Sequence, residues 1–339
     1  MTDLEFKRIV THNDFDGIVS GAICSFVTGC DQIIFTGPNS IARAEVSVGS
    51  SDIVTDLPYP LDCGMWFDHH PGNLDAVKLR GIDPSSIPGR FAEKPSCARV
   101  VLEYFTGEGF EMPAHIAATV DEADTIDSFD YRSVAEWREE TPGKLVDMAI
   151  KSDFRDFREQ TRFLQRLTGM FREMPLAEIA ADEEISARIA SYKTGEEKMM
   201  KLITESVSFL KEDTGHELIV MDFTHHKRRP RVIRNLAYIL YPDALGAMTI
   251  NSLFRRGTKT NDISISISLS MNMTGRDHKK DMGEIMRELD IGDGHTGAAA
   301  GTIHCHSKDM MLREKKRALD EIWAMWKAMP AGPDQRASE

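Results

Sequence analysis

Aspartate and histidine residues form four short clusters in the first 130 residues of the sequence. The segment THNDFDG, residues 11–17, holds one histidine and two aspartates directly after an apolar run. Asp56 follows a second apolar run, FDHH at residues 67–70 ends a third, and DEADTID spans residues 121–127. Carboxylates this close together repel one another and raise one another's pKa values unless a cation balances them. THNDFDG alone is typical of a capping turn that opens a helix, and FDHH alone of a polar loop, but together the clusters indicate a metal site.

The elements predicted around these clusters alternate between strands and helices. Pro95 and Ser96 open a helix that runs through Phe105, with Ser96 as its N-cap. Such alternation is typical of βαβ units and of an α/β domain with a mostly parallel sheet, whose ligands bind beyond the carboxyl ends of the strands. We therefore expect the clusters to converge there. The predicted strands are residues 6–10, 32–36, 52–55 and 65–67, and the first helix is 17–27.

The rest of the chain predicts a helical stretch and a second, smaller α/β domain. Helical periodicity covers residues 153–172 and 181–211, and a strictly alternating strand, ISISISLS, lies within residues 262–271. With 339 residues, two domains are expected. The predicted division is a metal-binding domain (1–190), a helical connector (191–214), a C-terminal domain (215–330) and a disordered tail (331–339). Further strands are predicted at 217–223 and 247–255, and helices at 232–241, 280–289 and 308–329.

Composition narrows the class of protein. The formal net charge of −13 argues against a protein whose whole surface binds nucleic acid, although it allows a local basic groove. The sequence shows no signal-peptide pattern and no apolar run of bilayer length, and its five cysteines form no C-x-x-C pair. We therefore expect a cytoplasmic protein without a membrane partner, and a homodimer stays an open alternative.

A ligand set of aspartates and imidazoles suits Mn²⁺ better than Ca²⁺, because Ca²⁺ prefers sites made only of oxygen ligands. Mg²⁺ and Co²⁺ are the alternatives. Two such ions about 3.5–4 Å apart favour in-line displacement at phosphorus, and they lower the pKa of bound water to about 7. The clusters therefore predict hydrolysis of a phosphate ester by a hydroxide that two metal ions activate.

At these residues the sequence resembles a known family. H-x-D-x-D-G-x-x-S (His12 to Ser20), Asp56, Asp68-His69-His70 and the later Asp124 resemble the motif series of the DHH phosphoesterases. Residues 292–301, GDGHTGAAAG, resemble the G-G-G-H-x-x-A-A-G signature of their associated C-terminal domain. The resemblance implies a metal-bearing N-terminal domain and a smaller C-terminal domain that closes over the phosphate.

The resemblance also implies roles for single residues. Asp56 is the expected bridge between the ions, His70 the residue that meets the reacting phosphate, and Asp68 its support. Asp124 has neighbouring alternatives in Asp121, Glu122 and Asp127. In the C-terminal domain the expected substrate contacts are the imidazole of His295 and the backbone N–H groups near Gly292 and Gly294. The implied metal ligands are His12, Asp14, Asp16, Asp56, His69 and Asp124.

Three features bear on the substrate. Asp293 stands where the family signature has glycine, and SLSM at residues 268–271 lacks the arginine of an S-L-R-S-like strand found in many nucleotide-cleaving relatives. The basic segment HHKRRPRVIR, residues 225–234, predicts either a substrate groove that includes Arg228 and Arg229 or a solvated loop that enters a helix.

We predict a phosphodiesterase for short oligonucleotides or dinucleotides, cyclic ones included, as in the nanoRNase and cyclic-dinucleotide branches of the family. The alternatives within the same chemistry are a 3′-phosphoadenosine phosphate phosphatase and a pyrophosphatase or exopolyphosphatase. Alternatives of another class are a nucleotide-binding regulator without turnover, suggested by Asp293 and the missing arginine, and a nucleic-acid-processing factor.

Overall fold

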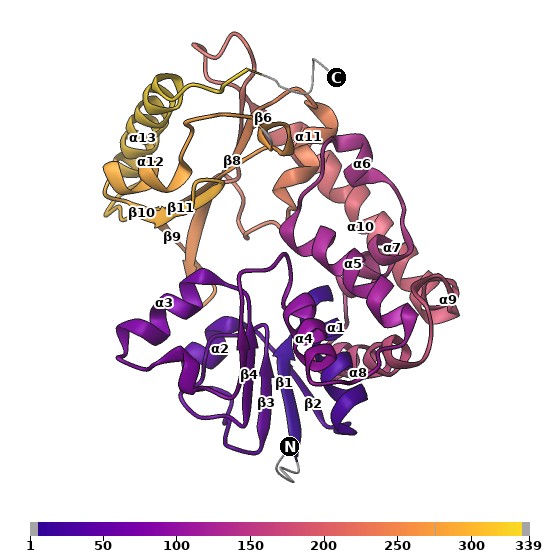
Figure 1. Ribbon diagram of the computed structural model, residues 1–339. Helices are drawn as coiled ribbons and strands as arrows, with labels where there is room; N and C mark the ends of the chain where they lie inside the picture. Colours follow the sequence, from indigo (N-terminus) through magenta and orange to yellow (C-terminus); the bar gives the residue numbers. More distant parts are fainter. Residues whose placement is uncertain (1–5, 275, 334–339) are drawn as a thin grey trace. The chain divides into compact units, whose positions relative to one another are not determined.

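The structure, a computed structural model, describes residues 6–274 and 276–333 (Figure 1). The chain divides into two compact units, which we call unit 1 (Met1–Asp130 and Glu140–Gly195) and unit 2 (Tyr131–Glu139 and Glu196–Glu339). The division falls inside helix α10 (Glu183–Ser206). The short segment Tyr131–Glu139 differs from the predicted division, because it belongs to unit 2, where Arg138 pairs with Glu196 at 2.6 Å. Part of the predicted tail, residues 334–339, lies outside the described residues.

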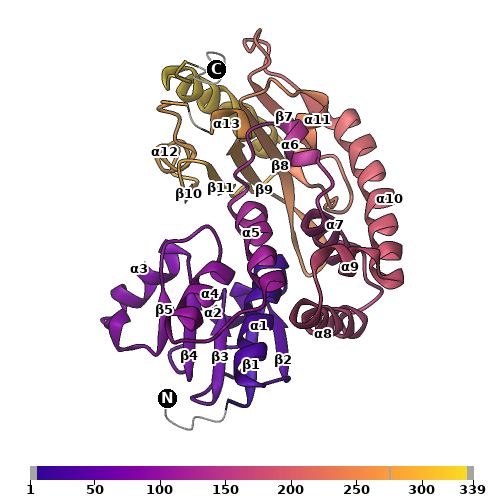
Figure 2. The same cartoon turned by 45° about the vertical axis from the view of Figure 1, so that its right-hand side comes forward.

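The sheet of unit 1 has five parallel strands in the order β2-β1-β3-β4-β5 (Figure 2). Successive side chains of a strand point to opposite faces, and both faces are covered here. Ile9 and Ile53 lie in one core with helices, while their neighbours Val10 and Val54 lie in the core on the other side. The strands are β1 (Arg8–His12), β2 (Ile33–Thr36), β3 (Asp52–Thr55), β4 (Met65–Asp68) and β5 (Gly89–Phe91).

Helices cover the two faces of this sheet. The larger core involves α1 (Phe15–Thr28), α4 (Cys97–Gly107), α5 (Ala114–Ser128), α7 (Pro142–Ile150), α8 (Phe157–Glu173) and α9 (Leu176–Ala181). The smaller core lies under α2 (Pro38–Ala42), α3 (Pro71–Leu79) and the 3₁₀ turn η1 (Pro84–Ser86). The predicted N-cap of α4 is confirmed, because the Ser96 hydroxyl accepts a hydrogen bond from the Arg99 N–H.

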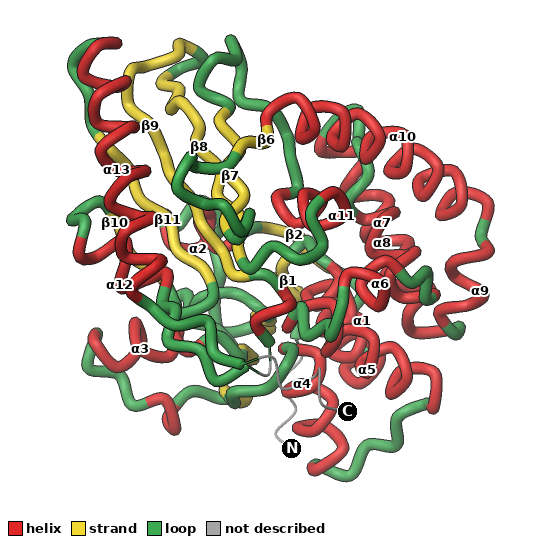
Figure 3. The backbone as a smooth tube through the Cα atoms, turned by 90° about the horizontal axis from the view of Figure 1, so that it is seen from above, coloured by secondary structure: helices red, strands yellow, loops and turns green. Residues whose placement is uncertain are grey.

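Unit 2 contains a six-stranded sheet in the order β10-β11-β9-β8-β7-β6, with β7 and β8 parallel and the other neighbours antiparallel (Figure 3). Helices α12 (Met282–Glu288) and α13 (Lys308–Ala328) share its core with Ile263, Ile265 and Ile267. The strands are β6 (Val207–Ser208), β7 (Leu218–Asp222), β8 (Gly246–Arg255), β9 (Thr258–Leu269), β10 (Gly292–Gly294) and β11 (Ala298–Ile303).

One predicted helix of unit 2 is much shorter than expected. Residues 232–241 form the 3₁₀ turn η2 (Arg234–Leu236) and the single helical turn α11 (Ala237–Leu240). The difference lies at the N-terminal side, where residues 232–236 are not α-helical, whereas the end at Leu240 agrees with the prediction because Pro242 disfavours a helical conformation at Tyr241. The short helix α6 (Val134–Arg138) also belongs to this unit. No helix in the described part of the chain is long and apolar enough to cross a membrane.

Candidate metal centre

The three central strands of unit 1 bring the predicted ligands together. Strands β1, β3 and β4 are adjacent and parallel, so their carboxyl ends lie at one edge of the sheet. Three overlapping groups of ligand atoms form there, each with its atoms within 4.8 Å of one another. The groups are His12, Asp14 and Asp56; Asp16, His69 and Asp127; and Asp56, His69 and His70. The expected convergence is therefore found.

Asp56 lies at the centre of the cluster and is 4 % exposed. Its φ of 56° places it in the left-handed region, which aspartate tolerates better than most residues. Neither carboxylate oxygen has a hydrogen-bond partner among the described residues. Ring nitrogens of His12, His69 and His70 lie 3.3, 3.6 and 3.7 Å from them. Because a buried carboxylate without partners is costly, this arrangement fits a shared cation.

The ring of His69 is oriented for metal binding. Its Nδ1 lies 3.0 Å from the carbonyl oxygen of Lys94, so the Nδ1–H donates there, and in the neutral ring Nε2 carries the lone pair. Nε2 is buried, has no hydrogen-bond partner in the described part of the chain, and lies 3.3 Å from Asp127 and 3.7 Å from Asp16. Metal-ligating histidines usually donate their other N–H to a carbonyl in this way. The sequence did not reveal the part that Lys94 takes.

Asp16 is held by the first turn of a helix from another part of the chain. Its two oxygens accept hydrogen bonds from the backbone N–H groups of Cys97 and Ala98, at 2.8 and 2.7 Å, at the start of α4. Burial, together with repulsion from Asp56 and Asp127, raises the pKa of Asp16 well above its usual range. The charged form therefore needs a further positive partner, which a divalent ion supplies.

His12 and Asp14 form the third side of the cluster. Asp14 is the N-cap of α1, where it accepts a hydrogen bond from the Gly17 N–H, and its other oxygen lies 2.7 Å from His12 Nδ1. Burial lowers the pKa of His12, but Asp14 and Asp56 outweigh it and raise that pKa to about 10. A proton on His12 thus balances the negative charge of Asp14 and Asp56, which a bound metal ion would otherwise balance. Aspartate and imidazole ligands together fit a borderline ion such as Mn²⁺.

His70 is paired with Asp68 at the edge of the cluster. Asp68 is fully buried, and its Oδ1 lies 2.8 Å from His70 Nδ1. The other oxygen of Asp68 accepts a hydrogen bond from the Asn73 side chain at 2.6 Å, a contact that the sequence did not reveal. The hydrogen bond with Asp68 raises the pKa of His70, whose side chain is half exposed. Because Nδ1 faces Asp68, Nε2 of His70 is left for another partner.

Asp124 was predicted as a ligand, but the structure places it outside the cluster. It accepts hydrogen bonds from Arg99 at 2.6 and 2.8 Å and from the Ser96 hydroxyl at 2.6 Å, so it joins α5 to α4. Asp127, less than one turn later on α5, has its Oδ2 3.3 Å from His69 Nε2. Burial and repulsion from Asp56 raise the pKa of Asp127 to about 6. Asp127, and not Asp124, therefore belongs to the cluster of possible ligands.

Comparison with solved structures gives the fold. The pGpG-specific phosphodiesterase PggH from Vibrio cholerae aligns with a TM-score of 0.70 and 23% sequence identity, covering 94% of this chain and 99% of that one. A DHH domain from a protein described as a member of a family of ribosomal proteins aligns with a TM-score of 0.55 and 13% identity, covering 95% and 87% of the two chains. This chain has the DHH fold.

The fold that the motifs predict is therefore confirmed. A scan of family models and a search of curated proteins both found no match to the sequence. Within the DHH fold, the three residues that give the motif its name have separate surroundings here. His69 faces the carboxylate cluster, whereas Asp68 and His70 pair with one another.

The two predicted glycines of unit 2 are explained by strand pairing. A Cβ at Gly292 would lie 2.1 Å from the carbonyl oxygen of Ala300, and one at Gly294 would lie 2.4 Å from the Cα of Ala299. The two glycines therefore let β10 approach β11 closely. This explains them whether or not their N–H groups contact a phosphate. His295 follows them in an exposed turn closed by backbone hydrogen bonds with Ala298.

The charge of Asp293 is balanced within unit 2. Its carboxylate accepts a hydrogen bond from Arg287 Nη1 at 2.6 Å and another from the Gly294 N–H at 2.8 Å. The hydrogen bond from Arg287 lowers the pKa of Asp293. The predicted substrate residues Arg228 and Arg229 lie exposed in the loop between β7 and η2. Their role stays a prediction.

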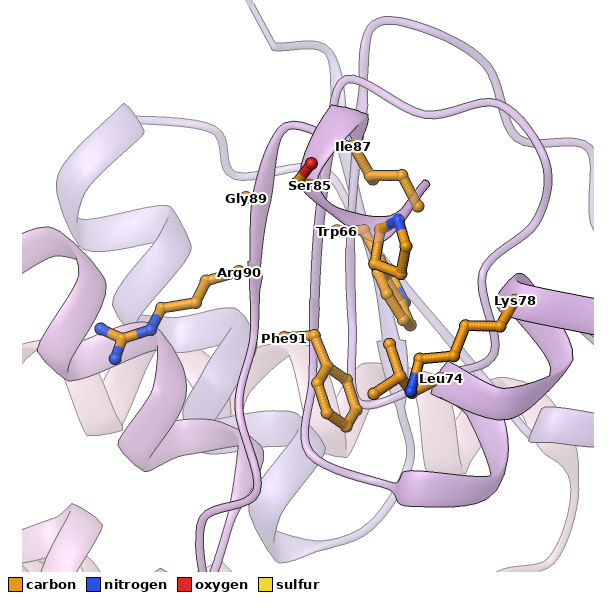
Figure 4. A pocket seen from close by; sticks show the side chains of 9 residues that line it. Trp66, Leu74, Lys78, Ser85, Ile87, Gly89, Arg90 and Phe91 are labelled. Carbon is orange, nitrogen blue, oxygen red and sulfur yellow. The ribbon is translucent and has the colours of Figure 1, made fainter. Parts of the chain in front are cut away.

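A separate pocket of about 420 Å³ lies in unit 1 against β4 and β5 (Figure 4). Trp66, Leu74 and Phe91 are among its apolar lining residues, and the side chain of Arg90 points away from them. No carboxylate lines it, and none of the predicted site residues does. The candidate metal centre is therefore distinct from this pocket.

Proposed function

We propose that the protein is a divalent-metal-dependent phosphodiesterase that hydrolyses dinucleotides and short oligonucleotides, cyclic dinucleotides included. The observation that carries the proposal is the buried Asp56 carboxylate, which lacks hydrogen-bond partners among the described residues and is surrounded by imidazole nitrogens. The similarity to PggH over nearly the whole chain favours a dinucleotide among the phosphate esters. We also propose a cytoplasmic location, with a homodimer as an open alternative.

The proposed metal is Mn²⁺, with Mg²⁺ or Co²⁺ as alternatives, bound as two ions. When bound, such ions act as Lewis acids on the phosphate and lower the pKa of a water molecule. The protein would position the substrate through His70, which is held by Asp68 and would donate a hydrogen bond to the phosphate. His295 stays a predicted substrate contact. The proposed ligands are His12, Asp14, Asp16, Asp56, His69 and Asp127.

The alternative of a binding protein without turnover is weakened by the structure. It depended on the charge of Asp293, and Arg287 balances that charge. It depended also on the missing arginine in SLSM, and Arg234 brings a guanidinium group to the same strand.

The test is hydrolysis of a substrate panel by metal-free protein supplied with Mn²⁺, Mg²⁺ or Co²⁺. The panel contains pGpG, a second 5′-phosphorylated dinucleotide, a cyclic dinucleotide, a short RNA, 3′-phosphoadenosine phosphate, pyrophosphate and polyphosphate. We expect dinucleotides to be cleaved fastest with Mn²⁺, EDTA to abolish cleavage, and Asp56→Asn to lower the rate by at least about 100-fold. Faster cleavage of pyrophosphate or of 3′-phosphoadenosine phosphate would replace the proposed substrate. Absence of metal-dependent hydrolysis of every compound would refute the enzyme.

A further inference from the structure

One face of the unit 2 sheet is polar and built from small side chains. In β9 the isoleucines at 263, 265 and 267 are buried in the core with α12 and α13, so Ser264, Ser266 and Ser268 lie on the opposite face. Ser266 and Ser268 are paired across the sheet with Ala300 and Ala298 of β11, which are exposed. The alanines leave room beside the serine hydroxyls.

A guanidinium group reaches this face without a carboxylate partner. Arg234, in η2, donates a hydrogen bond from Nη1 to the Ser266 hydroxyl at 2.7 Å. Its Nε is buried and has no hydrogen-bond partner, and among the described residues no carboxylate lies within 4.0 Å of the group. Burial lowers the pKa of Arg234, and the weaker opposing effect comes from the phenol of Tyr238 and not from a carboxylate. The partly buried guanidinium group of Arg99, by contrast, does have a carboxylate partner in Asp124.

A second polar group on the same face is also unpartnered. Ser268 is 7 % exposed, and its hydroxyl oxygen has no hydrogen-bond partner among the described residues. It lies two residues along β9 from Ser266, which contacts Arg234. The face continues to the turn that carries His295, because Ser268 pairs with Ala298 and the Leu269 N–H donates to Gly297.

A largely buried cation without a counter-charge is destabilising, and a bound anion would compensate it. Arginine suits phosphate because its planar donors match two phosphate oxygens at once, and hydroxyl groups serve the remaining oxygens. We propose that Arg234, together with the hydroxyl groups of Ser266 and Ser268, forms an oxyanion site that holds a phosphate group of the substrate. Arg234 of η2 would thus supply to β9 the guanidinium group that the segment SLSM at the end of this strand lacks. That this phosphate belongs to a nucleotide rests on the proposed function, whereas phosphate binding itself does not.

The first experiment measures phosphate binding without metal or turnover. The thermal midpoint of the full chain in EDTA is followed as inorganic phosphate replaces chloride at constant ionic strength. We expect phosphate to raise the midpoint of the wild type and of Arg313→Met, a control on an exposed arginine of α13. Arg234→Met is expected to lose the shift. A wild type without a phosphate-specific shift, or a shift that Arg234→Met retains, would overturn the proposal.

The second experiment measures the steady-state hydrolysis of two dinucleotides, one with and one without a 5′-phosphate. We expect Arg234→Met to raise KM about 10- to 100-fold with a smaller change in kcat, as for loss of a charged hydrogen bond. An increase for the 5′-phosphorylated compound alone assigns the site to the terminal phosphate, and an increase for both assigns it to the phosphodiester. Arg234→Lys and Ser266→Ala are expected to give intermediate KM values.

These measurements separate a binding role from a structural one. If Arg234 only stabilises the fold, Arg234→Met lowers the unfolding midpoint but leaves both KM and the phosphate shift unchanged, which contradicts the proposal. If the wild type hydrolyses neither dinucleotide, the proposed function fails while the phosphate experiment in EDTA still decides the site.

Discussion

At the scale of single residues, two aspartates of α5 show how position on a helix decides a role. Asp124 and Asp127 are three residues apart, so their side chains are rotated by about 60° around the helix and displaced by about 4.5 Å along it. Asp124 is bound by Arg99 and Ser96 of α4, and its charge is already balanced. Asp127 instead faces the imidazole of His69, so it is the residue that a metal ion would stabilise.

This contrast gives a prediction for the metal content of two variants. Asp127→Asn is expected to lower the bound metal after equilibrium dialysis, because it removes a charged ligand from the cluster. Asp124→Asn is expected to bind the same amount of metal but to lose about 1–3 kcal/mol of unfolding free energy in EDTA, because it weakens the hydrogen bonds from Arg99. Elemental analysis and urea unfolding measure the two quantities. Metal loss in Asp124→Asn with full binding in Asp127→Asn would restore the original assignment.

At the scale of elements, the C-terminal end of α13 is capped from a distant segment. Lys280 is 2 % exposed, and its ammonium group donates hydrogen bonds to the carbonyl oxygens of Trp326 and Met329, at 2.9 and 3.0 Å. It also lies 4.0 Å from the centre of the Trp326 ring. A cation at the end of a helix is favourable, but burial here lowers the pKa of Lys280 to about 8.

The lowered pKa predicts how stability changes with pH. Between pH 8 and about 10.5 the unfolded chain binds a proton at Lys280 that the folded chain has released, so stability increases as the pH rises. The slope from this group is at most about 1.4 kcal/mol per pH unit. Below pH 8 the cost of burying the charge is fully present.

Urea unfolding at pH 7, 8, 9 and 9.5 tests this prediction, with Lys280→Met as the matched variant. Above pH 8 the unfolding free energy of the wild type is expected to increase relative to that of Lys280→Met. A difference that is constant across this range would show that Lys280 stays charged in the folded protein.

At the scale of the whole molecule, the two units have separate cores and separate chemistry. The residues proposed to bind metal all belong to unit 1, whereas Arg234, the serine face of β9 and His295 belong to unit 2. Each unit buries its own apolar side chains, so each has its own source of stability. The two kinds of binding can therefore be measured separately in the full chain.

Metal binding is expected to stabilise unit 1 selectively. At 100 times the dissociation constant, a bound ion adds about 2.7 kcal/mol to any opening that breaks the site. Hydrogen exchange measured by mass spectrometry should therefore slow in the segments after β1, β3 and β4 when Mn²⁺ is added, and stay unchanged in β8 and β9. Asp56→Asn should lose the protection. Equal protection of both units would contradict the placement of the metal in unit 1.

Most strands and the metal cluster's main residues could be predicted because they depend on local patterns. An apolar run followed by polar ligands predicts a buried strand and its carboxyl end, and parallel pairing of β1, β3 and β4 brings Asp14, Asp56 and His69 to one edge. The serine and isoleucine alternation in β9 likewise predicted a strand with two unlike faces.

The sequence by itself thus determined the fold class, the parallel sheet and the carboxylate and imidazole chemistry of its edge. Tertiary structure decided which of two aspartates on α5 joins that chemistry, because the choice depends on an arginine in another helix. It also decided that β10 needs glycines for strand pairing, and that Arg234 reaches Ser266 across 32 residues of sequence. Such contacts join segments whose spacing in the chain carries no periodic signal, so packing alone selects them.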